Sequence, residues 1–286
     1  MKAFLPQVII DGLIDAVRDT ARREIMPRFR NLRPGAIDTK SAPDDLVTEA
    51  DRAAERAITD AVRVLLPAAL VVGEEAAFET PGLLDELATA EMAVIVDPVD
   101  GTWNFANGLA VFGVILAVTI RGETVFGLLY DPVMDDWIVA ERGRGAWYCR
   151  PGKAPVRCPG PSRKPLGESH GVVPLFLFPK EQQAGIAACF QKINRVSALR
   201  CSCHEYRMMA LGSVDFILSP MAKPWDHAAG LLVIEECGGQ VISGQRCGYA
   251  PGFPQMPLIA CGHGAEEIQA IFFPWTGSHS GTARGS

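Results

Sequence analysis

Apolar residues at near-helical spacing mark the first part of the chain. Residues 7–30 carry them on one face, which predicts an amphipathic helix that ends beyond Pro27. A second helix is predicted over 48–66, because Thr48 is a good N-cap and Asp51 follows three residues later. The intervening segment, 31–43, contains two prolines and a glycine, so we expect a loop or a short ribbon there.

A strand-like run begins at Met92 and leads to Asp97. Its β-branched residues predict a buried strand that stops at Asp97, since Pro98 biases the preceding residue away from the α region. The chain then turns through Asp100 and Gly101. A bare Asp-Gly turn would account for this segment equally well.

Strands and turns alternate from 111 to 148, which indicates a meander in an antiparallel or mixed sheet. Other strands are expected at 69–75, 214–218, 240–243 and 258–260, and other helices at 81–90, 179–193, 204–211, 226–236 and 264–273. The segment 149–165 is rich in proline, glycine and basic residues and is interpreted as a seam. We therefore expect halves at 1–150 and 151–275, followed by a disordered tail at 276–286.

Composition narrows the function. The 286 residues carry a net charge of −6, which argues against general binding to nucleic acid or an anionic membrane but leaves room for a small phosphorylated substrate. No apolar run reaches the roughly 18 residues of a membrane span, and Asp11 and Asp15 interrupt any leader sequence. The eight cysteines form no C-x-x-C pair, so we expect reduced thiols in a cytoplasmic protein. A zinc site at Cys201-Ser202-Cys203-His204 is disfavoured because no second ligand pair stands at a suitable spacing.

Acidic residues stand where predicted strands or loops meet helices: Asp51, Glu74, Asp97, Asp100 and Asp226. Each is also typical of a helix cap or a solvated turn. As a set of metal ligands, however, Glu74 and the later three aspartates offer only hard oxygen donors. Such a set favours Mg²⁺ or Mn²⁺ over zinc.

Together these segments resemble the inositol monophosphatase family, within the superfamily that includes fructose-1,6-bisphosphatase. The matching motifs are Asp45-Leu46-Val47-Thr48-x-x-Asp51, Gly73-Glu74-Glu75, Asp97-Pro98-Val99-Asp100-Gly101-Thr102-x-Asn104-Phe105 and Trp225-Asp226-x-Ala228-x-Gly230. The resemblance spans about residues 7–272 and implies an α/β (α+β) layered sandwich in which helix and sheet layers alternate. Haloacid-dehalogenase-type phosphatases share part of the central motif, but two residues separate Asp97 from Asp100 here, which argues against an aspartyl-phosphate mechanism.

The resemblance implies hydrolysis of a phosphomonoester by in-line attack of a metal-activated water. It assigns Glu74, Asp97 and the Val99 carbonyl to one Mg²⁺. It assigns Asp97, Asp100 and Asp226 to a second, with a third, weaker ion near Glu74. It further implies that Thr102, hydrogen-bonded to Asp51, would activate the water together with Glu74. The N–H groups of Gly101 and Thr102 would bind the phosphate oxygens.

The substrate is less constrained. By resemblance, the residues facing it are Asp100, Gly101, Thr102, Arg200, Cys201, Ser202, Ser219 and Asp226. Inositol-specific relatives carry a Gly-Thr/Ser-Ala run where this chain has Arg200-Cys201-Ser202, and an acid where it has Ser219. Arg200 is either a surface residue beside a helix or faces a second anionic group of the substrate.

Inositol 1-phosphate or a similar polyol phosphate is the first expectation. Histidinol phosphate and other small sugar or nucleotide phosphates remain open, because Cys203-His204-Glu205-Tyr206 resembles histidinol phosphatases. The resemblance also implies lithium inhibition and a homodimer, and the net charge leads us to expect neither nucleic acid nor membrane as a partner. A regulatory binding protein that keeps the phosphatase fold is an alternative, although a binding role alone would not need every acid and Thr102. A structural calcium site is a third interpretation of the acids.

Overall fold

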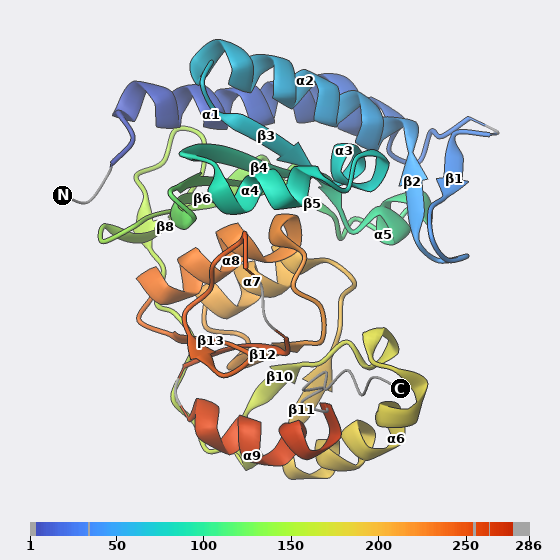
Figure 1. The fold of residues 1–286 in the computed structure, drawn as a ribbon, viewed down its shortest axis with the longest axis vertical. Coiled ribbons are helices and arrows are strands. Elements are labelled where there is room, and N and C mark those ends of the chain that lie inside the picture. Colours follow the sequence, from blue (N-terminus) through green and yellow to red (C-terminus); the bar gives the residue numbers. More distant parts are fainter. Residues whose placement is uncertain (1–3, 34, 254–255, 263, 277–286) are drawn as a thin grey trace, which may run out of the picture.

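Five layers of secondary structure build the molecule (Figure 1). The computed structural model describes residues 4–33, 35–253, 256–262 and 264–276. Helices α1 and α2 cover one face of a seven-stranded sheet, and α7 and α8 lie between that sheet and a six-stranded one. Helices α6 and α9 cover the far face of the second sheet. The expected sandwich of alternating helix and sheet layers is confirmed.

The N-terminal layer follows the predicted pattern. Helix α1 spans Gln7–Thr20 and continues through a π turn, Ala21–Ile25, and a 3-10 turn, Met26–Arg28. Strands β1 (Ile37–Thr39) and β2 (Leu46–Thr48) form an antiparallel ribbon that leads into α2 (Glu49–Leu65). Thr48 and Asp51 form the expected capping box, in which Thr48 N–H donates to Asp51 Oδ2 at 2.9 Å.

The first sheet contains the predicted meander. Its strands, in spatial order, are β3 (Leu70–Gly73), β4 (Met92–Asp100), β5 (Gly113–Ile120), β6 (Glu123–Asp131), β7 (Asp136–Glu141), β8 (Gly145–Cys149) and β9 (Val156–Arg157). Only the β3–β4 pair is parallel within the described part of this sheet. Helices α3 (Glu74–Glu79) and α4 (Leu83–Thr89) connect β3 to β4, and α5 (Thr102–Ala106) follows β4.

The expected end of the central strand at Asp97 is wrong. Strand β4 pairs Asp97 with Ile115, shifts its register, and pairs again at Asp100 with Gly113. Pro98 has no N–H to donate, so the ladder is interrupted there without ending. This irregularity places both aspartates on β4 before the chain turns at Gly101.

The second sheet has the order β11 (Arg195–Ser197), β10 (His170–Val172), β12 (Phe216–Ser219), β15 (Leu258–Cys261), β13 (Gln240–Ser243) and β14 (Arg246–Cys247). Its helices are α6 (Lys180–Cys189), α7 (Ser202–Ala210), α8 (Pro224–Glu236) and α9 (Ala265–Thr276). Further 3-10 turns span Leu166–Glu168, Leu175–Leu177 and Phe190–Lys192. Strands β9, β10, β11 and β14 were not predicted, because two or three residues are too few for a visible alternation.

Three apolar cores hold the layers together. One joins α1 and α2 to the first sheet, one surrounds α7 and α8, and one lies under α6 and α9. The division at residue 150 stays a prediction, and the first sheet runs on to β9 at Arg157. The tail expected at 276–286 lies outside the described residues except for Thr276, where α9 ends. None of the described helices is long and apolar enough to cross a membrane.

Candidate active site

A cavity of about 470 Å³ opens where β4, α5, α7 and α8 meet the β1–β2 ribbon. Carboxylates dominate its charged lining: Asp44, Asp45, Glu74, Asp97, Asp100, Glu205 and Asp226. All the residues that the sequence predicted to face a substrate also line it: Asp100, Gly101, Thr102, Arg200, Cys201, Ser202, Ser219 and Asp226.

Three carboxylates converge at the bottom of this cavity. Asp97 and Asp100 come from β4 and Asp226 from the first turn of α8, and one oxygen of each lies within 4.8 Å of the other two. Burial, followed by repulsion from neighbouring acids, raises the pKa of all three, that of Asp100 to about 6 and that of Asp226 to about 7. Among the described residues this is the one group of histidines, cysteines and acids with the geometry of a cation site, and its donors are all oxygens.

Helix α7 fixes the orientation of Asp100. The N–H of Cys203 donates to Asp100 Oδ2 at 2.5 Å, the N–H of Ser202 donates to Oδ1 at 3.2 Å, and Cys201 Sγ donates to Oδ2 at 3.1 Å. These contacts join residues about a hundred positions apart, so the sequence motif alone could not predict them. Cys201 therefore acts as a hydrogen-bond donor to a carboxylate in this cavity.

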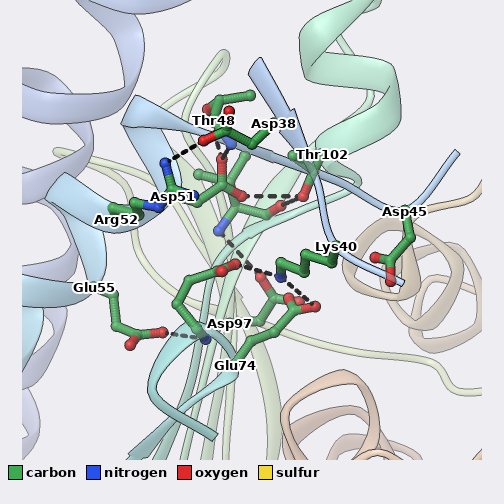
Figure 2. Close-up of polar contacts among 12 residues, drawn as sticks. Asp38, Lys40, Asp45, Thr48, Asp51, Arg52, Glu55, Glu74, Asp97 and Thr102 are labelled. Carbon is green, nitrogen blue, oxygen red and sulfur yellow. Dashed lines mark hydrogen bonds and ion pairs between the residues drawn. The ribbon is translucent and has the colours of Figure 1, made fainter. Parts of the chain in front are cut away.

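Glu74 begins α3 and lies beside two ammonium groups. Lys40 Nζ lies 3.1 Å from Glu74 Oε1 and 2.6 Å from Glu75 Oε1, and Lys223 Nζ lies 3.9 Å from Glu74 Oε1. Figure 2 shows Lys40 reaching from the ribbon toward the acids. Sequence reasoning assigned no role to Lys40 or Lys223, because only the fold brings them to Glu74.

Glu55 positions the start of α3. Its two carboxylate oxygens accept the N–H groups of Glu75 and Ala76, each at 2.8 Å. Gly73 makes this possible, since a Cβ at that position would lie 2.2 Å from Glu55 Cδ. The Gly-Glu-Glu motif thus has a steric reason for its glycine.

Thr102 connects β4 to α2. Its Oγ1 lies 3.0 Å from Asp51 Oδ1 and 3.0 Å from the Val99 carbonyl oxygen, so one hydroxyl proton is shared between two acceptors (Figure 2). Asp51 also accepts the Thr48 hydroxyl at 2.6 Å. Burial raises the pKa of Asp51 to about 6. Asp51 and Val99 are not among the residues that line the cavity; they support Thr102 from behind it.

The backbone conformation at position 101 requires a glycine. Its φ is +87°, and a Cβ would lie 2.9 Å from the Val111 carbonyl oxygen. Asn104 fixes the same corner by donating to the carbonyl oxygens of Val111 and Leu199, each at 2.8 Å. The Asp-Gly-Thr-x-Asn sequence therefore forms a rigid turn at the edge of the cavity.

Three further lining residues had no predicted role. Tyr206 OH lies 2.9 Å from His227 Nδ1, and both side chains are buried. Burial raises the pKa of Glu205 to about 8, and this carboxyl accepts the Leu199 N–H at 2.6 Å. No spacing in the sequence would have brought Glu205 and His227 to one cavity.

The layered fold resembles that of a solved IMPase, and the cavity lining supplies carboxylates that could hold a metal ion. The family model described as "Inositol monophosphatase family" matches residues 6–271, and the chain belongs to this family. The chain is therefore a phosphatase.

Individual relatives agree with this assignment. The chain is 29% identical over 205 residues to a Thermotoga maritima protein named fructose-1,6-bisphosphatase/inositol-1-monophosphatase, covering 72% of this chain and 74% of that one. It is 32% identical over 213 residues to the Vibrio cholerae protein named Nus factor SuhB, covering 71% and 73%. The solved structure of a Thermotoga maritima IMPase aligns with a TM-score of 0.76 and 26% identity over 93% of this chain and 96% of that one.

Proposed function

We propose that this protein hydrolyses small phosphomonoesters with Mg²⁺ as its cofactor. The observation that carries the proposal is the convergence of three buried or half-buried carboxylates beside the Thr102–Asp51 pair in one open cavity. An all-oxygen donor set fits a hard divalent cation, and Mn²⁺ is a substitute. The raised carboxyl pKa values support this fit, because bound cations would offset the repulsion that raises them.

The residues proposed to hold two to three ions are those implied by the motifs. Glu74, Asp97 and the Val99 carbonyl would hold the first ion, and Asp97, Asp100 and Asp226 the second. The ammonium groups of Lys40 and Lys223 near Glu74 support the idea that this carboxylate is built to face positive charge. When bound, Mg²⁺ would lower the pKa of the attacking water and neutralise the phosphate.

Thr102 is the proposed catalytic hydroxyl. If its proton points to Asp51 Oδ1, a lone pair of Oγ1 is free to accept a hydrogen bond from the attacking water, and as Oγ1 takes the water's proton its own proton passes to Asp51. Asp51 holds that arrangement, and Glu74 assists from the neighbouring α3. The N–H groups of Gly101 and Thr102, at the turn into α5, would bind the phosphate oxygens.

A polyol phosphate such as inositol 1-phosphate is the first substrate to test. Ser219 stands where inositol-specific relatives carry an acid, so histidinol phosphate and other sugar or nucleotide phosphates belong in the same assay. Phosphate release should be measured for inositol 1-phosphate, histidinol phosphate, fructose 1,6-bisphosphate and 3′-phosphoadenosine 5′-phosphate, with Mg²⁺, with EDTA and with Li⁺. Activity that needs Mg²⁺ and falls with Li⁺ supports the proposal, and uniformly negligible release contradicts it.

A regulatory binding role is the second candidate, favoured by similarity to proteins named Nus factor SuhB. The two roles can coexist in one chain. The same assay separates them, since a protein that only binds a partner would release no phosphate. Light scattering would test the proposed homodimer.

A further inference from the structure

Arg200 contacts two aromatic rings at the wall of the cavity. Its guanidinium carbon lies 4.7 Å from the ring centroid of Trp103, on α5, and 4.8 Å from that of Phe176, on the 3-10 turn Leu175–Leu177. All three side chains line the cavity. A guanidinium packed against aromatic rings keeps its hydrogen-bonding edge free and loses little further freedom when it binds a ligand.

The backbone at Arg200 adopts a conformation that arginine disfavours. Its φ is +56°, in the left-handed region where a Cβ crowds the neighbouring carbonyl. Two contacts hold the preceding residue: Glu205 accepts the Leu199 N–H at 2.6 Å, and Asn104 donates to the Leu199 carbonyl oxygen at 2.8 Å. Strain of this kind persists only where the surroundings impose it, and it often accompanies a functional constraint.

The Arg200 side chain uses only part of its hydrogen-bonding capacity. Nη2 donates to the carbonyl oxygen of Asp44 at 3.2 Å and to its carboxylate Oδ2 at 3.1 Å. Within the described residues, Nε and Nη1 have no hydrogen-bond acceptor, and 28% of the side chain is exposed. Three of the five N–H donors of a guanidinium are therefore available to a ligand in the cavity.

The surroundings of Arg200 differ from those of Lys223, the other basic side chain in the described cavity lining. Of the described residues that line the cavity, Arg200 is the one arginine, and the other basic residue, Lys223, lies 3.9 Å from Glu74. Arg200 instead lies on the side formed by Trp103 and Phe176. Because Arg200 and the three carboxylates line one cavity, an ester whose phosphate lies near the carboxylates has its alcohol half in the same cavity as this guanidinium.

We infer that Arg200 selects phosphomonoesters whose alcohol half carries a second anionic group, a carboxylate or another phosphate. This inference rests on the proposed phosphatase function and names the substrate class for the same cavity. A planar fork of N–H donors matches the paired oxygens of either anion. Inositol 1-phosphate and histidinol phosphate, whose alcohol halves carry no second anionic group, fall outside this class, so the inference narrows the substrates proposed above.

The test compares esters that differ only in the second group. One pair is 3-phosphoglycerate and glycerol 3-phosphate, and the other is fructose 1,6-bisphosphate and fructose 1-phosphate. For each pair we expect the member with the second anionic group, 3-phosphoglycerate or fructose 1,6-bisphosphate, to have the higher kcat/KM. In Arg200→Asn the ratio within each pair should fall roughly 10- to 100-fold, the effect of one charge-assisted contact. The two pairs distinguish a carboxylate preference from a phosphate preference.

Variants separate recognition from structure. Asparagine tolerates the left-handed conformation better than most residues, so Arg200→Asn should keep the fold. Arg200→Lys keeps the charge but not the fork, and should recover only a small part of the ratio. Arg195→Asn removes an exposed arginine of β11 that does not line the cavity and should leave the ratio unchanged.

Binding without turnover provides an independent measurement. The Nε–Hε NMR signal of Arg200 can be assigned by its loss in Arg200→Asn. In Ca²⁺ in place of Mg²⁺, this signal should shift on titration with the member of each pair that carries the second anionic group and not with the other member. If Arg200→Asn changes kcat/KM equally for both members of a pair, the inference is overturned and the proposed function still stands. A selective NMR shift without any hydrolysis would contradict the proposed function and leave recognition of the second anionic group by Arg200 standing.

Discussion

Thr102 Oγ1 lies 3.0 Å from Asp51 Oδ1, although fifty-one positions separate the two residues in the chain. The capping box at the start of α2 fixes Asp51, and the turn after β4 fixes Thr102. Removing the hydroxyl should therefore remove the proposed proton relay from the attacking water to Asp51 while the layers stay intact. We expect Thr102→Ala to lower kcat by about 10²–10⁴-fold and Thr102→Ser to retain most activity. Steady-state kinetics with Mg²⁺ checks this, and equal losses in both variants would contradict the proposed role.

Asp97→Asn should separate activity from stability. We expect kcat/KM to fall more than about 100-fold, because a proposed ligand of two ions is lost. In EDTA at pH 8, however, the variant should melt at a higher temperature than the wild type, since burial and neighbouring acids disfavour the charged Asp97. Thermal melts with and without Mg²⁺ test both expectations. Asp60→Asn, at an exposed position of α2, is the control and should change neither.

Metal-free stability should fall as the pH rises. The pKa values of Asp51 and Asp100 are about 6 and that of Asp226 is about 7, all above the ordinary value of 3.8. The folded state therefore binds more protons than the unfolded state between about pH 4 and pH 7, so the free energy of unfolding decreases across that window. Denaturant titrations in EDTA measure this, and Mg²⁺ should offset the loss because its ligands must be deprotonated. A metal-free free energy of unfolding that increases from pH 5 to pH 7 would contradict the prediction.

Gly73→Ala should displace the start of α3. The new methyl group would lie 2.2 Å from Glu55 Cδ, in a carboxylate that holds two α3 N–H groups. We expect a loss of about 1–3 kcal/mol in the free energy of unfolding, with weaker Mg²⁺ binding because Glu74 begins that helix. Gly82→Ala is the matched control: no atom lies within 4 Å of its Cβ position, so stability should stay the same or rise by about 0.4–1 kcal/mol. Equal effects at the two positions would argue against the Glu55 contact.

Local signals in the sequence were sufficient for most of the fold. Helix α2 begins at its predicted cap because Thr48 and Asp51 satisfy N–H groups within a single turn. The meander β5–β8 was predictable since each strand pairs with its neighbour in the chain. The end of β4 was not, because pairing with β5 carried the strand past Pro98.

The types and order of the acids, and hence a site of hard oxygen donors, could be predicted from the amino-acid sequence. The way in which they meet depends on how the layers pack. Asp226 reaches Asp97 and Asp100 because α8 packs across the first sheet, and α7 turns its N–H groups toward Asp100. The same packing brings Lys40 to Glu74 and places Arg200 against the rings of Trp103 and Phe176. Such contacts join distant segments of the chain, whereas a motif records only what neighbouring residues do along it.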